Sequence, residues 1–173
     1  DPSDMEAYVA RIGGISRALG QLQARARLNV EAGARPPLFA YEGVIQQARA
    51  LITGAPFSGP GDSPIWADAK AKIDALAKAG KIDPAKADAL RDSARIALLT
   101  QWGPAYHALI DWLEADKVNA DKVATGVGKN PNGPAYVAMR LRNMTTTDMT
   151  PEQVQQFGLS EVARIHAEMA VIQ

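Results

Sequence analysis

Hydrophobic residues recur at spacings of three and four along most of the chain, and this period is typical of amphipathic helices. β-Branched residues never alternate cleanly with polar ones, so strands are expected to be nearly absent. Glycines, prolines and capping residues divide the pattern into segments. Helices are predicted over residues 3–32, 38–53, 64–79, 84–115 and 134–143, with a further helix that begins at residue 151. The predicted class is all-α: long antiparallel helices that form the bundle-like half of a larger helical protein.

Two places interrupt this pattern. Residues 54–64, with the sequence GAPFSGPGDSP, are predicted to be one long loop without regular structure, because glycine and proline disfavour it. Ser63 at its end is expected to cap the next helix, with Pro64 in the first turn. Asp83 is expected to cap the following helix in the same way. Within the helix over 84–115, Gly103 and Pro104 predict a kink or a break, because proline removes a hydrogen bond and clashes with the preceding turn.

The last predicted helix carries a clear start signal. Thr150 is the expected cap, Pro151 the first helical residue, and Gln153 completes a capping box. Five apolar residues follow at helical spacing and predict a stripe that enters a core: Val154, Phe157, Val162, Ile165 and Met169.

Chain length, composition and net charge limit the classes of protein to which this chain can belong. The chain has 173 residues, 32 of them alanine, and we interpret residues 1–173 as a single helical domain. Its ends lack start and stop signals, so we expect a fragment of a longer chain. The formal net charge of zero argues against a nucleic-acid partner. No apolar run reaches the roughly 18 residues of a membrane span. Arg25, Arg27 and Arg35 are interpreted as part of a solvated face.

Candidate metal and catalytic residues are sparse. The chain has no cysteine and two histidines, His107 and His166. His166 and Glu161 are five residues apart, which is about 140° around a helix, so they do not share a face. We therefore predict no metal site and no cofactor in this chain, and no catalytic residue. Asp111 and Glu114 are interpreted as an ordinary surface pair.

The C-terminal third resembles a known family. The stretch from Gly126 to Met169 is similar to the bacterial family known as domain of unknown function 885. Weaker similarity extends upstream through most of the chain. The shared features are Gly126, Asn132-Gly133, Tyr136, threonines 145–147, Pro151-Glu152, Gly158-Leu159, Glu161-Val162 and Glu168-Met169. Val137 and Gln155 depart from the family pattern, which has tyrosine and histidine there.

The resemblance implies a function. Members of the family look like helical zinc metallopeptidases of the gluzincin type, often secreted or lipid-anchored. Their zinc motif belongs downstream, so the resemblance implies zinc in the missing C-terminal half rather than in this chain. It makes that half the expected partner, a peptide the expected substrate, and the periplasm or extracellular space the expected location. Asn132, Gly133 and Tyr136 are the candidate substrate-binding residues of the full-length protein.

Two further interpretations compete with a non-catalytic scaffold segment. The chain could instead be a stand-alone helical binding module without enzymatic role. The chain could also be an intact small enzyme, but this interpretation is disfavoured because no set of polar side chains visibly converges. A large exposed apolar patch would favour the scaffold segment over the module.

Overall fold

The computed structural model describes residues 1–172 and divides the chain into two compact units. The N-terminal unit is Asp1–Ala124, and the C-terminal unit begins at Thr125. Whether residues 1–173 fold as one domain stays a prediction. The all-α class is confirmed, since helices dominate both units and the strands form one small pair.

The long helices follow the predicted order, and two short strands, which were not predicted, lie between α2 and α3. The elements of the described residues are α1 (Pro2–Glu31), α2 (Leu38–Leu51), β1 (Thr53–Ala55), β2 (Ser58–Asp62), α3 (Pro64–Lys78), α4 (Pro84–Ala97), η1 (Leu98–Trp102), α5 (Gly103–Asp116), η2 (Lys117–Asn119), η3 (Val127–Lys129), α6 (Gly133–Thr145) and α7 (Pro151–Ile172).

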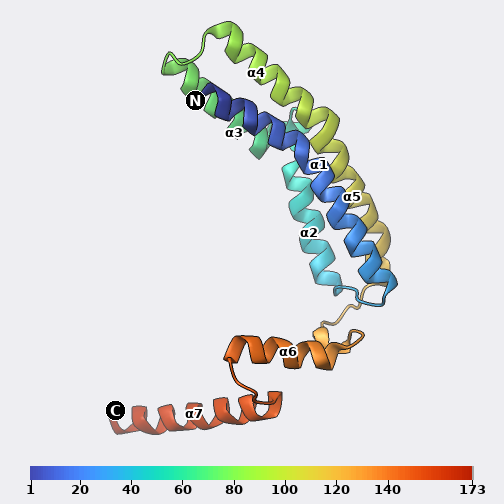
Figure 1. Cartoon of the computed structure of the whole chain (residues 1–173), viewed down its shortest axis with the longest axis vertical. Helices are drawn as coiled ribbons and strands as arrows, with labels where there is room; N and C mark the ends of the chain where they lie inside the picture. The colour runs from blue at the N-terminus through green and yellow to red at the C-terminus, as the bar shows by residue number, and fades with distance from the viewer. Residues whose placement is uncertain (173) are drawn as a thin grey trace. The chain divides into compact units, whose positions relative to one another are not determined.

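A continuous rod of α4, η1 and α5 forms the spine of the N-terminal unit, and α1 packs along it (Figure 1). The other two long helices each pack on one end of this rod: α3 contacts α4, and α2 contacts α5. Both segments of the rod carry apolar residues on the side that faces these helices. The N-terminal unit is therefore built as two short bundles that share α1 and the rod.

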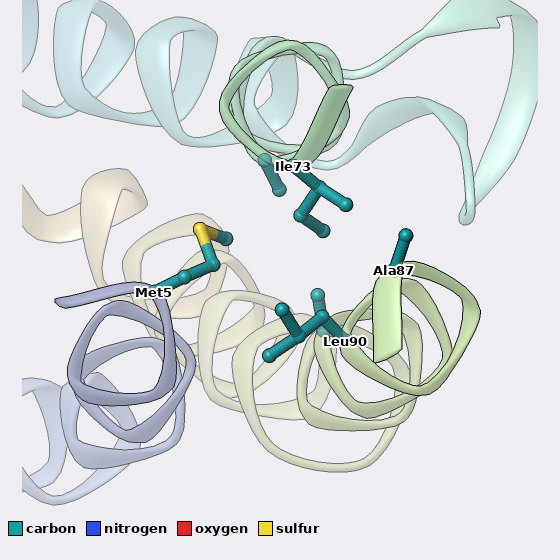
Figure 2. Packing of buried hydrophobic residues seen from close by; sticks show 6 residues of the cluster. Met5, Ile73, Ala87 and Leu90 are labelled. Carbon is teal, nitrogen blue, oxygen red and sulfur yellow. The ribbon is translucent and has the colours of Figure 1, made fainter. Parts of the chain in front are cut away.

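Three clusters of buried side chains follow the rod from end to end. The first joins α1, α3 and α4 through Met5, Ile73 and Leu90, which converge in Figure 2. The second joins α2 and α5 through Tyr41, Ile45, Ala48, Ile52, Ile110 and Leu113. The third lies at the middle, where Ile12 of α1 meets Ala97 and Leu98. Burial of these side chains is the main stabilising contribution to this unit.

The expected irregularity at Gly103 and Pro104 takes the form of a π-helix. Residues Leu98–Trp102 form η1 immediately before Gly103, and the backbone stays helical through the junction. A π turn bonds residue i to residue i+5, so it accommodates one extra residue without ending the helix. The helix thus continues past the proline instead of breaking.

The prediction that residues 54–64 lack regular structure is wrong. β1 and β2 pair in parallel, and the Ser63 amide donates to the Ala55 carbonyl at 2.8 Å. Glycine makes this possible: Gly54 has a φ of +90°, and a Cβ there would lie 2.7 Å from the carbonyl carbon of Asp62. The residue type that disfavours regular strands therefore permits the close backbone approach in this one.

The predicted caps are mostly confirmed. The Asp83 carboxylate accepts from the Lys86 amide at 2.7 Å. The capping box at α7 forms in full, because Thr150 Oγ1 accepts from the Gln153 amide at 3.2 Å and Gln153 Oε1 accepts from the Thr150 amide at 2.8 Å. Ser63 is different. It occupies the cap position of α3, but its hydroxyl makes no capping bond and is fully buried without a partner.

The apolar stripe of α7 does not enter a core among the described residues, contrary to the prediction. Phe157 is 59% exposed and Met169 is 53% exposed, and no residue of α7 is buried. In the C-terminal unit the only buried residue up to position 172 is Gly133. The helical period was predicted correctly, but a stripe is buried only where a partner covers it.

Across residues 1–172, no helix is both long enough and apolar enough to span a membrane.

Candidate functional site

Residues 126–136, which contain η3 and the first turn of α6, have a tightly folded backbone. Gly126 has a φ of +81°, the 3₁₀-helix η3 follows, and Asn132 adopts the left-handed conformation with a φ of +57°. Asparagine tolerates this region better than most residues because its short side chain clashes little. Asn132 then starts α6 as its cap residue, without a side-chain capping bond.

Gly133 closes the turn. Its amide donates to the Asn130 carbonyl at 2.7 Å. A Cβ on Gly133 would lie 2.2 Å from the Gly128 carbonyl oxygen and 2.7 Å from the Val127 carbonyl oxygen. Both neighbours are backbone atoms and cannot rotate away, so only glycine fits here. The sequence hypothesis placed Gly133 in a binding site; its immediate role is to let η3 pack against the start of α6.

Tyr136 lies one turn further along α6 and is held by this loop. Its amide donates to the Asn132 carbonyl at 3.0 Å, the first hydrogen bond of the helix. Its side chain is 48% exposed, so it is not a core residue. Its hydroxyl has no hydrogen-bond partner among residues 1–172. The structure therefore brings Asn132, Gly133 and Tyr136 together in one turn, with an exposed phenol at its end.

A second unpaired group lies in the same loop. The side-chain oxygen of Asn130 is shielded from solvent and accepts no hydrogen bond within the described chain. A buried acceptor without a donor costs about 1–3 kcal/mol, so such groups are uncommon in packed structures. Asn130 was not predicted from the sequence, because nothing in the pattern marks an unsatisfied oxygen.

The N-terminal unit contains a polar network that sequence reasoning missed. Arg35 donates two hydrogen bonds to the Asp116 carboxylate, Nε at 3.1 Å and an Nη at 3.0 Å, and the Tyr41 hydroxyl donates to the same carboxylate. Arg35 was assigned to a solvated face, which is wrong. These hydrogen bonds lower the pKa of Asp116, above all those from Arg35. Burial, together with Asp116, raises the pKa of Tyr41 to about 12.

This network has a structural role. Arg35 lies in the connection before α2, Tyr41 in the first turn of α2, and Asp116 at the end of α5. Their hydrogen bonds therefore hold these three segments together. Every acidic oxygen of Asp116 is engaged by Arg35 or Tyr41. The network is therefore already satisfied and offers no free group for catalysis. A similar arrangement links α1 to α3, where Asp68 accepts from Tyr8 at 2.6 Å and also from Lys72.

The residues considered for metal binding do not assemble. His107 and His166 are both exposed, on α5 and α7 respectively. Within residues 1–172, no three side chains of histidine, aspartate or glutamate gather in a way that could hold a metal ion. Glu114 pairs with Arg49 at 2.7 Å and with Lys117, in agreement with its interpretation as a surface residue. The residues described therefore do not provide a ligand set that fits zinc.

Comparison with known proteins places the chain in a family of bacterial proteins. The sequence profile described as "Bacterial protein of unknown function (DUF885)" matches residues 1–173. Among curated proteins, none matches the chain.

One solved structure is similar over almost the whole chain. It is the crystal structure of a candidate lipoprotein from Colwellia psychrerythraea, with a TM-score of 0.80 and 17% sequence identity. The match covers 98% of this chain and 28% of the other. At this identity the likeness shows the fold alone. The chain spans a little over a quarter of the length of that protein.

Proposed function

We infer the function of this chain from the fact that it belongs to the bacterial DUF885 family, and we propose that it is a non-catalytic scaffold segment of a zinc metallopeptidase-like protein. In this proposal the chain forms one wall of the cleft in which a peptide is hydrolysed. Zinc is bound by residues outside this segment. The relation to gluzincin peptidases rests on the sequence resemblance from Gly126 to Met169.

The observation that carries the proposal is the loop over residues 126–136. A turn held by backbone contacts around Gly133 presents the Tyr136 side chain, 48% exposed, at the first turn of α6. A rigid turn positions a hydroxyl more accurately than a mobile one, which is what stabilisation of developing charge requires. Tyr136 would donate to a substrate carbonyl, while Asn132 and Gly133 would line the approach.

The exposed stripe on α7 supports the scaffold role. Phe157, Val162, Ile165 and Met169 are each more than two-fifths exposed on one helix. Several large apolar side chains exposed on one helix are typical of a surface that another element covers. Because the related structure is a chain of which this fold is 28%, we propose that helices of the rest of the protein cover α7.

The location proposed for the full protein is the periplasm or the extracellular space, with a lipid anchor or after secretion. The description of the related structure as a candidate lipoprotein supports this proposal.

The stand-alone binding module is the second candidate. The N-terminal unit has three buried clusters of its own, so it contains the core that an independent module needs. Under this alternative the α7 stripe would bind a separate protein, and no residue of the loop over 126–136 would affect hydrolysis.

Tyr136→Phe in the full-length, metal-loaded protein tests the proposal. The substitution keeps the ring and removes the hydroxyl. We expect an unchanged melting temperature and a loss of peptidase activity of about a hundredfold, the typical effect of deleting one such donor. The assay is the initial rate of peptide hydrolysis alongside thermal denaturation.

The matched control is Tyr106→Phe, which removes another hydroxyl with no hydrogen-bond partner among residues 1–172. It should leave the rate unchanged. Full activity of Tyr136→Phe, or a parallel fall in its activity and melting temperature, would show that the tyrosine is structural and would remove the loop from the site.

A further inference from the structure

A cavity of about 210 Å³ that is open to solvent on one side lies in the N-terminal unit, where the end of α1, the first half of α2 and the end of α5 meet. Ala26 and Val30 line it from α1, Val44 from α2, and Trp112 from α5. It lies within the second bundle and involves none of the residues in the loop over 126–136. The proposed peptidase site therefore does not explain it.

The cavity suits an apolar group. The small side chains of Ala26, Ala34 and Ala40 leave the space open, and the ring of Trp112 forms one wall. Arg27 lies over that ring with its guanidinium carbon 5.2 Å from the ring centre, which restrains the indole. An apolar cavity of about 150 Å³ is large enough to hold benzene. The space here therefore accommodates a side chain the size of leucine or phenylalanine.

The polar groups around the cavity limit the chemistry of its ligand. Tyr41 lines it, but its hydroxyl is already bonded to Asp116. Asn29 also lines it, and its carboxamide has no hydrogen-bond partner among the described residues. A carboxamide presents one acceptor and a pair of donor hydrogens, so it can pair with both halves of a backbone amide. This combination fits a neutral peptide better than a charged or a purely hydrocarbon ligand.

We propose that this cavity binds a bulky apolar side chain of a peptide, with the peptide backbone hydrogen-bonded to Asn29. That the natural ligand is a peptide rests on the proposed function; the cavity and its apolar preference do not. The site recognises leucine-like or phenylalanine-like residues, because every side chain that lines it is apolar apart from Asn29 and Tyr41. It gives the protein a peptide-binding position separate from the loop over 126–136.

The test uses the 173-residue chain and the probe N-acetyl-phenylalaninamide, followed by the indole N–H signal of Trp112 in ¹⁵N-correlated spectra. The signal is assigned with Trp112→Phe. A ligand of this size should bind with affinity on the order of millimolar. We expect a saturable shift with this probe and none with N-acetyl-alaninamide, which lacks the bulky group. Toluene, which lacks the amides, should bind at least about threefold more weakly.

Variants separate the two parts of the site. Ala26→Leu fills the cavity and should weaken binding of both ligands at least tenfold, and Val44→Phe should do so from α2. Ala24→Leu is the matched control, two residues away on the same helix and exposed. Asn29→Ala should weaken the phenylalanine probe by about three- to tenfold and leave toluene unchanged.

Three results would overturn the proposal. They are no saturable shift with the phenylalanine probe, equal loss of binding in Ala26→Leu and Ala24→Leu, or equal affinity for toluene and the probe. The last result would remove the peptide as ligand. None of them bears on the Tyr136→Phe experiment, which measures hydrolysis by the full-length protein.

Discussion

The two units of this chain use the same helical pattern in opposite ways. In the N-terminal unit the apolar stripes of five helices meet in three buried clusters. In the C-terminal unit α6 and α7 carry comparable stripes, yet Met139, Phe157 and Ile165 remain between about two- and three-fifths exposed. An amphipathic pattern therefore predicts that a helix has a face to bury, but not whether the partner for that face belongs to the same segment.

The difference between the two units is tested most strongly by replacing one apolar side chain in each of them. Leu98, at the centre of the rod, is 0% exposed, whereas Ile165 on α7 is 43% exposed. Leu98→Ala should lower the free energy of unfolding of the chain by about 2–5 kcal/mol, through lost burial and the cavity that remains. Ile165→Asp should change it by less than about 0.5 kcal/mol. Urea denaturation followed by circular dichroism measures both.

The same Ile165→Asp substitution in the full-length protein is the complementary experiment. If the rest of the protein covers α7, Ile165→Asp should destabilise it clearly, because a carboxylate would then be buried without a partner. A full-length variant as stable as the parent would show that α7 remains exposed there too, and would favour the binding module.

A smaller effect is expected at the polar network of the N-terminal unit. The Asp116 side chain is 11% exposed and accepts hydrogen bonds from Arg35 and Tyr41. Asp116→Asn keeps the shape but removes the charge that Arg35 pairs with, so it should cost about 1–3 kcal/mol at neutral pH. The matched control is Asp148→Asn in the C-terminal unit, where the paired side chains are 70% and 85% exposed and the effect should be near zero.

The pH dependence of this cost follows from the pKa shifts. The folded pKa of Asp116 is lowered, so its contribution is complete above the ordinary carboxyl pKa of about 4 and is lost as the pH falls through the folded value. The difference between parent and Asp116→Asn should shrink in acid. Tyr41 has the opposite sign: its contribution is complete below a pH of about 10 and is lost as the pH rises through its folded pKa of about 12. A difference independent of pH between 2 and 7 would contradict the network.

The smallest expected effect is an increase in the free energy of unfolding. Gly14 lies in α1, and a Cβ there would meet no atom within 4 Å. Gly14→Ala should therefore stabilise the N-terminal unit by about 0.5–1 kcal/mol, because alanine loses less backbone entropy than glycine. Gly158→Ala in α7 also has free space around its Cβ and should raise the helicity of the C-terminal unit without a cooperative shift in melting. A loss of stability in Gly14→Ala would show that α1 packs more closely than described.

Local features of the fold could be read from the sequence because neighbouring residues determine them. The caps at Asp83 and Thr150 each depend on residues within three positions. Contacts between distant segments could not be predicted in this way. Arg35 and Asp116 are 81 residues apart, and only the packing of α2 against α5 brings them together. The burial of Ser63 and the exposure of α7 likewise depend on what packs nearby.

In the candidate site, too, some features could be predicted from the sequence and others could not. Asn132 and Gly133 were marked by family resemblance, and the structure shows an obligatory glycine at the second position. Tyr136 was marked by family resemblance, and its exposure was not predictable from the sequence. The cavity beside Trp112 gave no signal at all, because a space lined by alanines has the same sequence pattern as a well-packed interface.

The π turn between α4 and α5 bears on which changes of chain length this fold can survive. Leu98 and Gly103 are both buried, one in each part of the rod. Successive residues of an α-helix are about 100° apart, so the five steps from Leu98 to Gly103 would place these residues, and the apolar stripes that they belong to, about 140° apart. The π turn absorbs one residue and reduces this offset to about 40°, which keeps both stripes on one side. A natural homologue lacking one residue between positions 98 and 102 would keep the same alignment in an unbroken α-helix. A deletion elsewhere in the rod would turn one bundle away from its partner, so length variation in this lineage should concentrate at the π turn.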